Sequence, residues 1–355
     1  MSAAGRADRA LTAVLERVAG TRAEVGERFP LYADPETGRW TTTRRGSWTG
    51  GFWAGLLWLR ARWTGAAEDR AAASAAVHRL APWVSADTAT RGLVLWYGTA
   101  LAGADPGAAA LRERAARACL EAWDPVLGTV PWGAALGGER ALARVDGVPG
   151  TVPLLAAAGP AGSRAAGAHL HRHLDLCLGD AGAPLVPAWR HTAAGWRPEG
   201  APAPGWSRGR AWLLLAVADA LARPEAERWR PEVLASAADR LTAGPGPLVP
   251  PADEGRAAGP LDTSAAAITA VALLKLARLP GPGARRHGRR AGAVLDRLVS
   301  VHLSGAAGGR PAGMLLDGCY DLERGTAVRH ELVWGDFFLA LGLAVRAGLV
   351  DPGEA

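Results

Sequence analysis

A tryptophan stands on each side of an arginine pair in the stretch PGWSRGRAW, residues 204–212. The apolar run LLLAVADAL follows directly, so we expect the stretch to enter a buried helix. Arg208 and Trp212 would then share one helix face and offer a cation and a flat aromatic ring to a small molecule. The planar fork of an arginine suits a carboxylate. In the alternative interpretation, Arg208 simply pairs with a neighbouring acid.

Tryptophan is the anomaly of the composition: the chain has 15, against 3 tyrosines and 4 phenylalanines. A single buried tryptophan is usually a core residue. Taken together, tryptophans in loops and at helix starts indicate a pocket lined with flat rings, on which sugars stack through their C–H faces. The tryptophans in such positions are Trp40, Trp48, Trp53, Trp132, Trp189, Trp196 and Trp206.

Three histidines in HLHRHLDL suggest a metal site, because His169 and His173 share a helix face. A helix that binds a metal normally needs a carboxylate or a third ligand from elsewhere, and the sequence identifies none. We therefore expect no metal. His191 and His330 fall in expected loops, where structural roles are the simpler interpretation.

Apolar residues recur at helical spacing along the whole chain, whereas strand-like alternation is scarce. No polar linker divides the chain, and segments such as LLLAVADAL are apolar almost all round, as expected for helices covered on every side. We predict an all-α fold in which an inner and an outer ring form an (α/α)6 barrel, a single catalytic domain over residues 1–355. An open solenoid is the alternative, but no regular repeat supports it. The expected helices cover residues 6–20, 50–63, 68–82, 90–103, 108–122, 148–158, 162–179, 207–222, 228–242, 263–278, 284–302 and 334–347.

The net charge of +6 comes almost wholly from arginine, since Lys275 is the one lysine. The densest basic cluster, Arg285 to Arg290, fits a solvated loop or helix start better than a nucleic-acid surface. Three distant cysteines form no CxxC pair, and the N-terminus lacks the apolar core of a signal peptide. No run reaches transmembrane length. We expect a soluble, cytoplasmic protein that binds neither nucleic acid nor membrane; oligomeric state is not predicted.

Four stretches in this order resemble the signature segments of glycoside hydrolase family 88, the unsaturated glucuronyl hydrolases, and of the related family 105. They are GSWTGGFWAGLLWLRARWTG (46–65), PGWSRGRAW (204–212), LDTSAAAITAVALLKLA (261–277) and LVWGDFFLALGLAV (332–345). The resemblance implies the same (α/α)6 barrel. It also implies two functional aspartates, which map to Asp146 in RVDGVPGTVPLLAAAG and to Asp87 in ADTATRGLVLWYG.

These aspartates have simpler interpretations too. Asp146 and Asp262 precede expected helices, where aspartate is a favoured N-cap that contributes about 1 kcal/mol. For Asp262 the cap is a sufficient explanation. Asp87 could be a plain surface or cap residue.

The chemistry that the resemblance implies is hydration of a sugar acid with a double bond between C4 and C5. A proton delivered to C4 leaves a cation at C5 that the ring oxygen shares, water adds there, and the hemiketal opens to release the aglycone. The site needs a carboxylic acid that stays protonated near neutral pH. We expect Asp146 to donate this proton and activate water, and Asp87 to assist. Neither a metal nor an organic cofactor is required.

We expect a small sugar or oligosaccharide as the substrate. Arg208 would anchor its uronate carboxylate or a polar group beside it, and Trp48, Trp132 and Trp212 would form the walls against which the sugar stacks.

The chain also departs from the family pattern. Ala86 replaces the histidine before the first aspartate, and Val186 or Pro187 falls where a second histidine is expected. Glu199 stands near an expected glutamine, and Arg210 replaces another, so we expect both beside the substrate. These changes leave two alternatives: changed chemistry on a different sugar in a biosynthetic pathway, or a non-catalytic carbohydrate-binding protein.

Overall fold

The computed structural model describes residues 3–180, 182–244, 246–305 and 309–355. Within these ranges the α-helices alternate along the chain between an outer and an inner position. The outer helices are α1 (Ala3–Val25), α3 (Ala67–Arg79), α5 (Pro106–Glu121), α7 (Gly159–Cys177), α9 (Pro231–Leu241) and α11 (Ala284–Arg297). The inner helices are α2 (Gly50–Thr64), α4 (Tyr97–Thr99), α6 (Thr151–Ala157), α8 (Ser207–Leu221), α10 (Thr263–Leu276) and α12 (Val333–Arg346).

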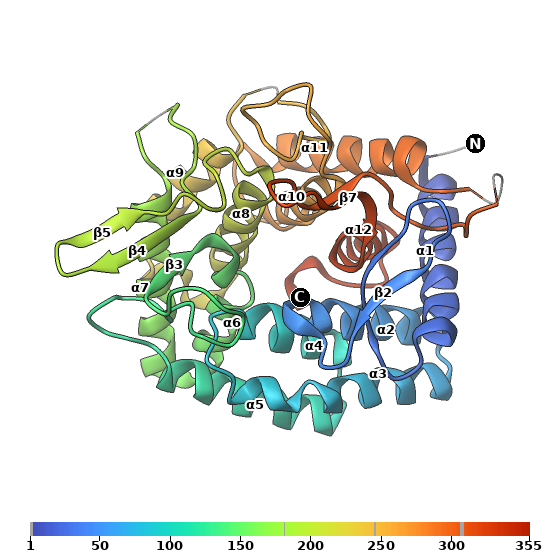
Figure 1. The fold of residues 1–355 in the computed structure, drawn as a ribbon, viewed down its shortest axis with the longest axis horizontal. Coiled ribbons are helices and arrows are strands. Elements are labelled where there is room, and N and C mark those ends of the chain that lie inside the picture. The colour runs from blue at the N-terminus through green and yellow to red at the C-terminus, as the bar shows by residue number, and fades with distance from the viewer. Residues whose placement is uncertain (1–2, 181, 245, 306–308) are drawn as a thin grey trace.

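The inner helices form a closed ring. Helix α8 packs on α10, α10 on α12, α12 on α2, and α2 on α4; the π-helical turn Gly92–Trp96 before α4 contacts α6, and α6 contacts α8. Figure 1 shows α12 in the interior, with α1, α5 and α11 along the periphery. An open solenoid would not close in this way. The ring therefore agrees with the expected arrangement of inner and outer helices.

Composition explains which helices lie inside. In α12 every residue from Val333 to Ala344 is buried, because the helix is apolar on all sides. In α11, by contrast, one face carries the buried residues His287, Ala291, Val294 and Leu295, while the arginines face outward. The expected helix at 90–103 is present in a modified form, since a short α-helical segment stands between a π-helical and a 3-10 turn.

The described chain is mostly helical, as predicted, but it is not strictly all-α, because two small antiparallel sheets accompany the helices. The first has the order β2-β1-β7-β6, and the second the order β3-β4-β5. With three to seven residues each, the strands are too short to give a readable alternating pattern. Their bounds are β1 (Phe29–Ala33), β2 (Trp40–Thr43), β3 (Leu142–Arg144), β4 (Ala188–Thr192), β5 (Gly195–Pro198), β6 (Gly318–Asp321) and β7 (Thr326–Leu332).

Both sheets lead into inner helices. In the first, Tyr32 of β1 pairs with Leu332 of β7, whose chain continues into α12. In the second, Ala143 of β3 pairs with Trp189 of β4. Aromatic rings fill the ring of helices: Phe52 lies 5.2 Å from Tyr97 and 5.5 Å from Phe337, between ring centroids. No helix among the described residues has both the length and the apolar character needed to cross a membrane.

Candidate active site

The N-terminal ends of the inner helices meet at one end of the ring, and hydrogen bonds join them. The Thr263 amide at the start of α10 donates to the Asp317 carbonyl, next to β6, at 3.1 Å. The Arg208 guanidinium at the start of α8 donates to the Tyr320 carbonyl in β6 at 2.7 Å. Just before α2, the Trp48 ring lies 4.8 Å from the Trp334 ring at the start of α12. Of the residues that the sequence singled out, Arg208 and Trp48 lie at this end of the ring.

Asp146 lies in a 3-10 turn, η5 (Val145–Gly147), between β3 and α6. Its carboxylate accepts two hydrogen bonds from Arg144, from Nε to Oδ1 at 3.0 Å and from Nη2 to Oδ2 at 2.9 Å. The Asp146 side chain is 16% exposed and that of Arg144 22%. The guanidinium carbon of Arg144 is 4.2 Å from the centroid of the Trp132 ring. Indole, guanidinium and carboxylate thus form one partly buried group of three side chains.

Asp146 is not the N-cap of α6, contrary to the simpler interpretation from the sequence. The N-cap of α6 is Gly150, and the Asp146 carboxylate is directed to Arg144 instead. Arg144 itself was missed by sequence reasoning. No pattern in the sequence indicated it, because the pair forms across the point where β3 ends at Arg144 and the η5 turn begins.

The carboxylates around Arg144 favour its charged form. Burial is the largest influence on its pKa and lowers it, yet the pKa is raised overall by the Asp146 carboxylate, through charge and hydrogen bonds, and by the charge of Asp321. Asp321 lies at the end of β6, so the guanidinium stands in the field of carboxylates from two separate parts of the chain.

Two buried histidines of α7 support the turn that carries Asp146. His169 Nδ1 accepts from the Val130 amide at 3.1 Å, so its proton is on Nε2, which faces the Gly147 carbonyl at 3.3 Å. His173 Nδ1 donates to the His169 carbonyl at 2.8 Å. Burial lowers the pKa of His173 to about 4 and that of His169 well below its usual value. Since backbone groups occupy both nitrogens of His169, this pair is a structural support rather than a metal ligand set.

Asp87 lies in the segment beside Trp132. Its Oδ2 accepts from the Ala134 amide and from Arg140 Nε, both at 3.1 Å, and its side chain is 43% exposed. Two residues further on, the Ala89 amide donates to the Trp132 carbonyl at 3.0 Å. The segments of Asp87 and Asp146 are therefore close neighbours, but within the described chain no hydrogen bond joins the two carboxylates.

Close backbone packing fixes these two segments against each other. Gly150 has a φ of +71°, and a Cβ atom there would lie 2.4 Å from the Gly92 carbonyl oxygen. The Thr151 hydroxyl donates to the Ala89 carbonyl at 3.0 Å. Only glycine combines this backbone conformation with such a close approach.

Arg208 is buried and binds through Nη1 and Nη2, while its buried Nε has no hydrogen-bond partner among the described residues. It forms an ion pair with Asp262 and donates to the carbonyls of Cys319 and Tyr320, at 2.5 and 2.7 Å. Its side chain is 3% exposed. Asp262 accepts from the Ser264 amide at 3.0 Å, which confirms that it caps α10. Arg208 therefore pairs with an acid, Asp262, as the alternative interpretation of the sequence expected.

Trp212 is not at a chamber wall. Its ring has no exposed surface and lies 6.0 Å from the Phe52 ring and 5.6 Å from the Phe338 ring, between centroids. Arg208 and Trp212 do share a helix side, but other helices cover that side completely. Trp212 is therefore a core residue, and the prediction that it stacks on the sugar is at odds with its position.

The other two tryptophans of the predicted wall keep some exposure. Trp48 is partly buried, and its Nε1 donates to the Tyr320 hydroxyl at 3.1 Å. Trp132 is 8% exposed, and its Nε1 donates to the Gly137 carbonyl at 3.1 Å. Tyr320, which sequence reasoning missed, belongs to this aromatic group.

Glu199 and Arg210 each have a partner of opposite charge. Glu199 accepts from Arg190 Nε at 2.6 Å, and Arg210 donates from Nε to Glu254 at 2.9 Å. The added acid and the added base are thus neutralised separately. Glu254 is 44 residues from Arg210 in the chain, so the sequence alone could not identify it. Arg190 of β4 and Glu199, directly after β5, belong to one hairpin, which the sequence did not predict.

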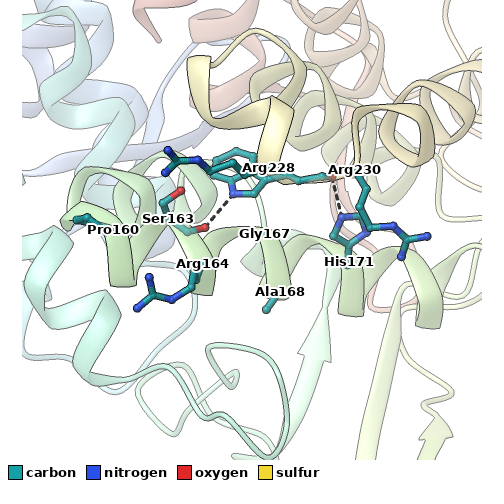
Figure 2. A pocket seen from close by; sticks show the side chains of 9 residues that line it. Pro160, Ser163, Arg164, Gly167, Ala168, His171, Arg228 and Arg230 are labelled. Atoms are coloured by element: carbon teal, nitrogen blue, oxygen red, sulfur yellow. Dashed lines mark hydrogen bonds between the residues drawn. The ribbon is translucent and has the colours of Figure 1, made fainter.

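Two surface pockets lie elsewhere, on the outer helices. One, of about 340 Å³, lies between α7 and the 3-10 turn η6 (Pro224–Arg228), where His171 Nε2 contacts the Trp229 carbonyl at 2.8 Å (Figure 2). The other, of about 440 Å³, lies between α7 and α9. Neither is lined by Asp146 or Asp87, so we do not assign the active site to them.

The fold places the protein in the class of helical rings in which an inner set of helices is surrounded by an outer set. No protein-family model and no curated protein sequence matches the chain. Among solved structures, the chain is similar to an unsaturated glucuronyl hydrolase of Bacillus sp. GL1, responsible for glycosaminoglycan degradation, with a TM-score of 0.81, 21% identity and 96% of each chain covered.

Two further unsaturated glucuronyl hydrolases are similar in the same way. One is specific for heparin, with a TM-score of 0.81, 18% identity and 97% of each chain covered. The other is an aspartate-to-asparagine variant from Streptococcus agalactiae in complex with dGlcA-GalNAc6S, with a TM-score of 0.74, 16% identity and coverage of 97% of this chain and 92% of that one. The resemblance stated from the sequence is therefore confirmed as a likeness in fold.

Proposed function

We propose that this protein is an enzyme that hydrates the C4=C5 double bond of an unsaturated uronic-acid sugar. The observation that carries the proposal is the position of Asp146. It is partly buried beside Trp132 and Arg144, on a fold shared over nearly its whole length with unsaturated glucuronyl hydrolases. A carboxyl group in an aromatic, partly dry environment is suited to general acid catalysis.

In the proposed reaction, the protonated Asp146 gives its proton to C4, and the electron pair of the double bond forms the new C–H bond. The cation left at C5 is shared with the ring oxygen. Water adds at C5 and returns a proton to the Asp146 carboxylate. The hemiketal then opens and the glycosidic bond breaks, so one water molecule is consumed for each aglycone released.

The other residues have supporting roles in this proposal. Asp87 holds the 133–140 segment next to Trp132 through its hydrogen bonds with Ala134 and Arg140. Trp48, Trp132 and Tyr320 supply the aromatic walls. Arg208 holds α8, α10 and β6 together beneath the substrate instead of touching it, and Glu199 and Arg210 lie further out.

We further propose a single (α/α)6-barrel catalytic domain over residues 1–355, with a small sugar or oligosaccharide as substrate and no cofactor. The closed ring of inner helices supports the barrel. We propose the cytoplasm as its compartment, in keeping with three buried cysteines that form no disulfide.

The direct test is absorbance. Unsaturated uronides absorb in the near ultraviolet, and hydration of the alkene removes this signal. We expect the purified protein to lower the absorbance of at least one member of a panel of unsaturated disaccharides that differ in linkage and sulfation. If the absorbance of every member persists at high enzyme concentration, the proposed reaction is wrong.

A second candidate is a carbohydrate-binding protein without hydration activity. It is favoured by the Arg144–Asp146 pair, because a bidentate arginine stabilises an ionised carboxylate rather than an acid. Such a protein would bind an unsaturated disaccharide, leave its absorbance intact and lose little affinity on Asp146→Asn.

A further inference from the structure

The Arg144–Asp146 pair stands in apparent conflict with the proposed chemistry. The reaction needs a carboxylic acid at position 146, yet two hydrogen bonds of 3.0 and 2.9 Å from a guanidinium favour the carboxylate. Something must remove Arg144 from Asp146 before a proton can reside there. The substrate itself carries a group that can do so, because a uronate offers Arg144 the same bidentate contact.

We propose that Arg144 is the receptor for the carboxylate of the sugar, and that the sugar, by taking Arg144, frees Asp146 to accept a proton from solvent. This inference rests on the proposed function and deepens it. It gives a reason for selectivity toward anionic sugars, since a neutral sugar would leave Asp146 paired with Arg144 and unable to donate a proton.

The position of Arg144 supports the exchange. Its guanidinium lies on the Trp132 ring, at 4.2 Å from the centroid, where a sugar stacked on an aromatic wall would meet it. Its side chain and that of Asp146 are 22% and 16% exposed, so a ligand can reach both. The carboxylate of the sugar would replace that of Asp146 on the Arg144 guanidinium, so the number of charge-assisted hydrogen bonds would stay the same.

The neighbouring arginines are less suited to this role. Arg208 is buried and bound to Asp262 and two carbonyls. Arg210 and Arg190 pair with Glu254 and Glu199, on other segments. Among these arginines, Arg144 alone has the proposed catalytic acid as its partner.

The local charges favour proton uptake when the sugar binds. Arg144 forms an ion pair with Asp146, and Asp321, which acts on Arg144 from β6, forms one with Arg324 at 3.7 Å. A bound uronate adds one negative charge to this group. A proton from solvent on Asp146 restores the original balance, and the reaction then transfers this proton to C4. After water addition and product release, Asp146 loses its proton to solvent and pairs with Arg144 again.

The other ionisable groups around Asp146 do not compete for this proton near neutral pH. From α7, burial lowers the pKa of His173 to about 4 and raises that of the Cys177 thiol, so both stay neutral. His169 is neutral for the same reason. In the first turn of α8, which packs against η5, the cations are Arg208, paired with Asp262, and Arg210, paired with Glu254.

Calorimetry of ligand binding tests the exchange without turnover. We would titrate methyl β-D-glucuronide, and methyl β-D-glucoside as the neutral match, in two buffers of different ionisation enthalpy at pH 7. Both sugars are saturated, so neither can be hydrated. We expect the glucuronide to take up between half a proton and one proton per site and the glucoside to take up none.

Variants assign the effect to residues. Arg144→Gln should weaken glucuronide binding at least tenfold and change glucoside binding less than twofold. Asp146→Asn should bind the glucuronide without proton uptake. Arg164→Gln, an exposed arginine on the outer side of α7, is the matched control and should behave as the wild type.

The inference is overturned if the glucuronide does not bind, if it binds without proton uptake, or if Arg144→Gln binds it as well as the wild type. Should Arg144→Gln fail to fold, the two-ligand comparison on the wild type decides alone. Failure of the proposed function looks different: the alkene absorbance persists while Arg144-dependent proton uptake remains. Conversely, if Arg144→Gln hydrates the alkene with an unchanged kcat/KM, the role of Arg144 is refuted and the proposed function stands.

Discussion

Arg208 and Asp262 form an ion pair in the interior, where their side chains are 3% and 0% exposed. The pair joins the first turn of α8 to the N-cap of α10, and Arg208 extends the link to β6. Arg208→Met leaves a buried carboxylate without its cation and should lower the free energy of unfolding by about 3–5 kcal/mol.

Arg210→Met is the control for this prediction. Its partner is Glu254, and both side chains are about one-third exposed, so we expect a loss of roughly 1 kcal/mol or less. Urea denaturation measures both variants. Similar small losses would mean that Arg208 is not a structural anchor and would return it to the list of ligand-binding candidates.

Gly150 should be essential for the geometry around Asp146. Gly150→Ala places a methyl group against the Gly92 carbonyl, in a left-handed conformation, and should destabilise the protein by well over the roughly 1–2 kcal/mol of the conformation alone. Gly65→Ala is the matched control, because Gly65 has a φ of +68° and no atom within 4 Å of its would-be Cβ. Thermal unfolding compares the two, and equal losses would show that the contact with Gly92 is unimportant.

The stability of the protein should depend on pH through His173. Burial lowers its folded-state pKa to about 4, below the usual value of about 6.5 in an unfolded chain. Between these values the unfolded chain binds a proton that the folded one does not, so stability is complete above pH 6.5 and is lost as the pH falls toward 4. At about 1.4 kcal/mol for each pH unit, the loss from His173 is roughly 3 kcal/mol.

Urea denaturation at pH 7 and pH 4.5 measures this dependence. His173→Gln should make the stability less sensitive to pH, whereas His171→Gln, two residues away on the outer side of α7, should retain the full slope. An unchanged slope in His173→Gln would mean that the imidazole is not held neutral.

The two buried tryptophans should separate binding from stability. Trp132→Phe loses the bond to the Gly137 carbonyl and part of the surface under Arg144, and should raise KM severalfold for an unsaturated uronide. Trp212→Phe, fully within the core, should cost about 1–3 kcal/mol of stability and change KM less than twofold. Steady-state kinetics with denaturation of the same samples checks both, and a reversed pattern would place Trp212 at the sugar.

The helices were predictable because their signals are local. Ala-rich segments with helical spacing, such as α10, define the elements, and segments apolar on all sides define the inner ring. The strands were missed because they have three to seven residues and gain their stability from pairing with distant segments.

The candidate site was predictable in part. Asp146, Asp87, Trp48 and Trp132 lie at the end of the ring where the N-termini of the inner helices meet. Arg208 and Trp212 share a helix face, as predicted, but they were wrongly expected to contact the substrate. Because other elements cover an inner helix on every side, sharing a face does not make two residues accessible to a ligand. Partners such as Glu254 lie far away in the chain, so no local pattern could reveal them.

The proposed function depends on proton delivery from Asp146 to C4, which hydration in deuterium oxide can follow. We would incubate an unsaturated glucuronyl disaccharide with the wild type and with Asp146→Asn, then locate deuterium in the product by NMR. We expect one deuterium at C4 with the wild type, and a loss of rate of a hundredfold or more in a folded Asp146→Asn. Loss of the alkene without deuterium at C4, or an Asp146→Asn variant as fast as the wild type, would contradict it.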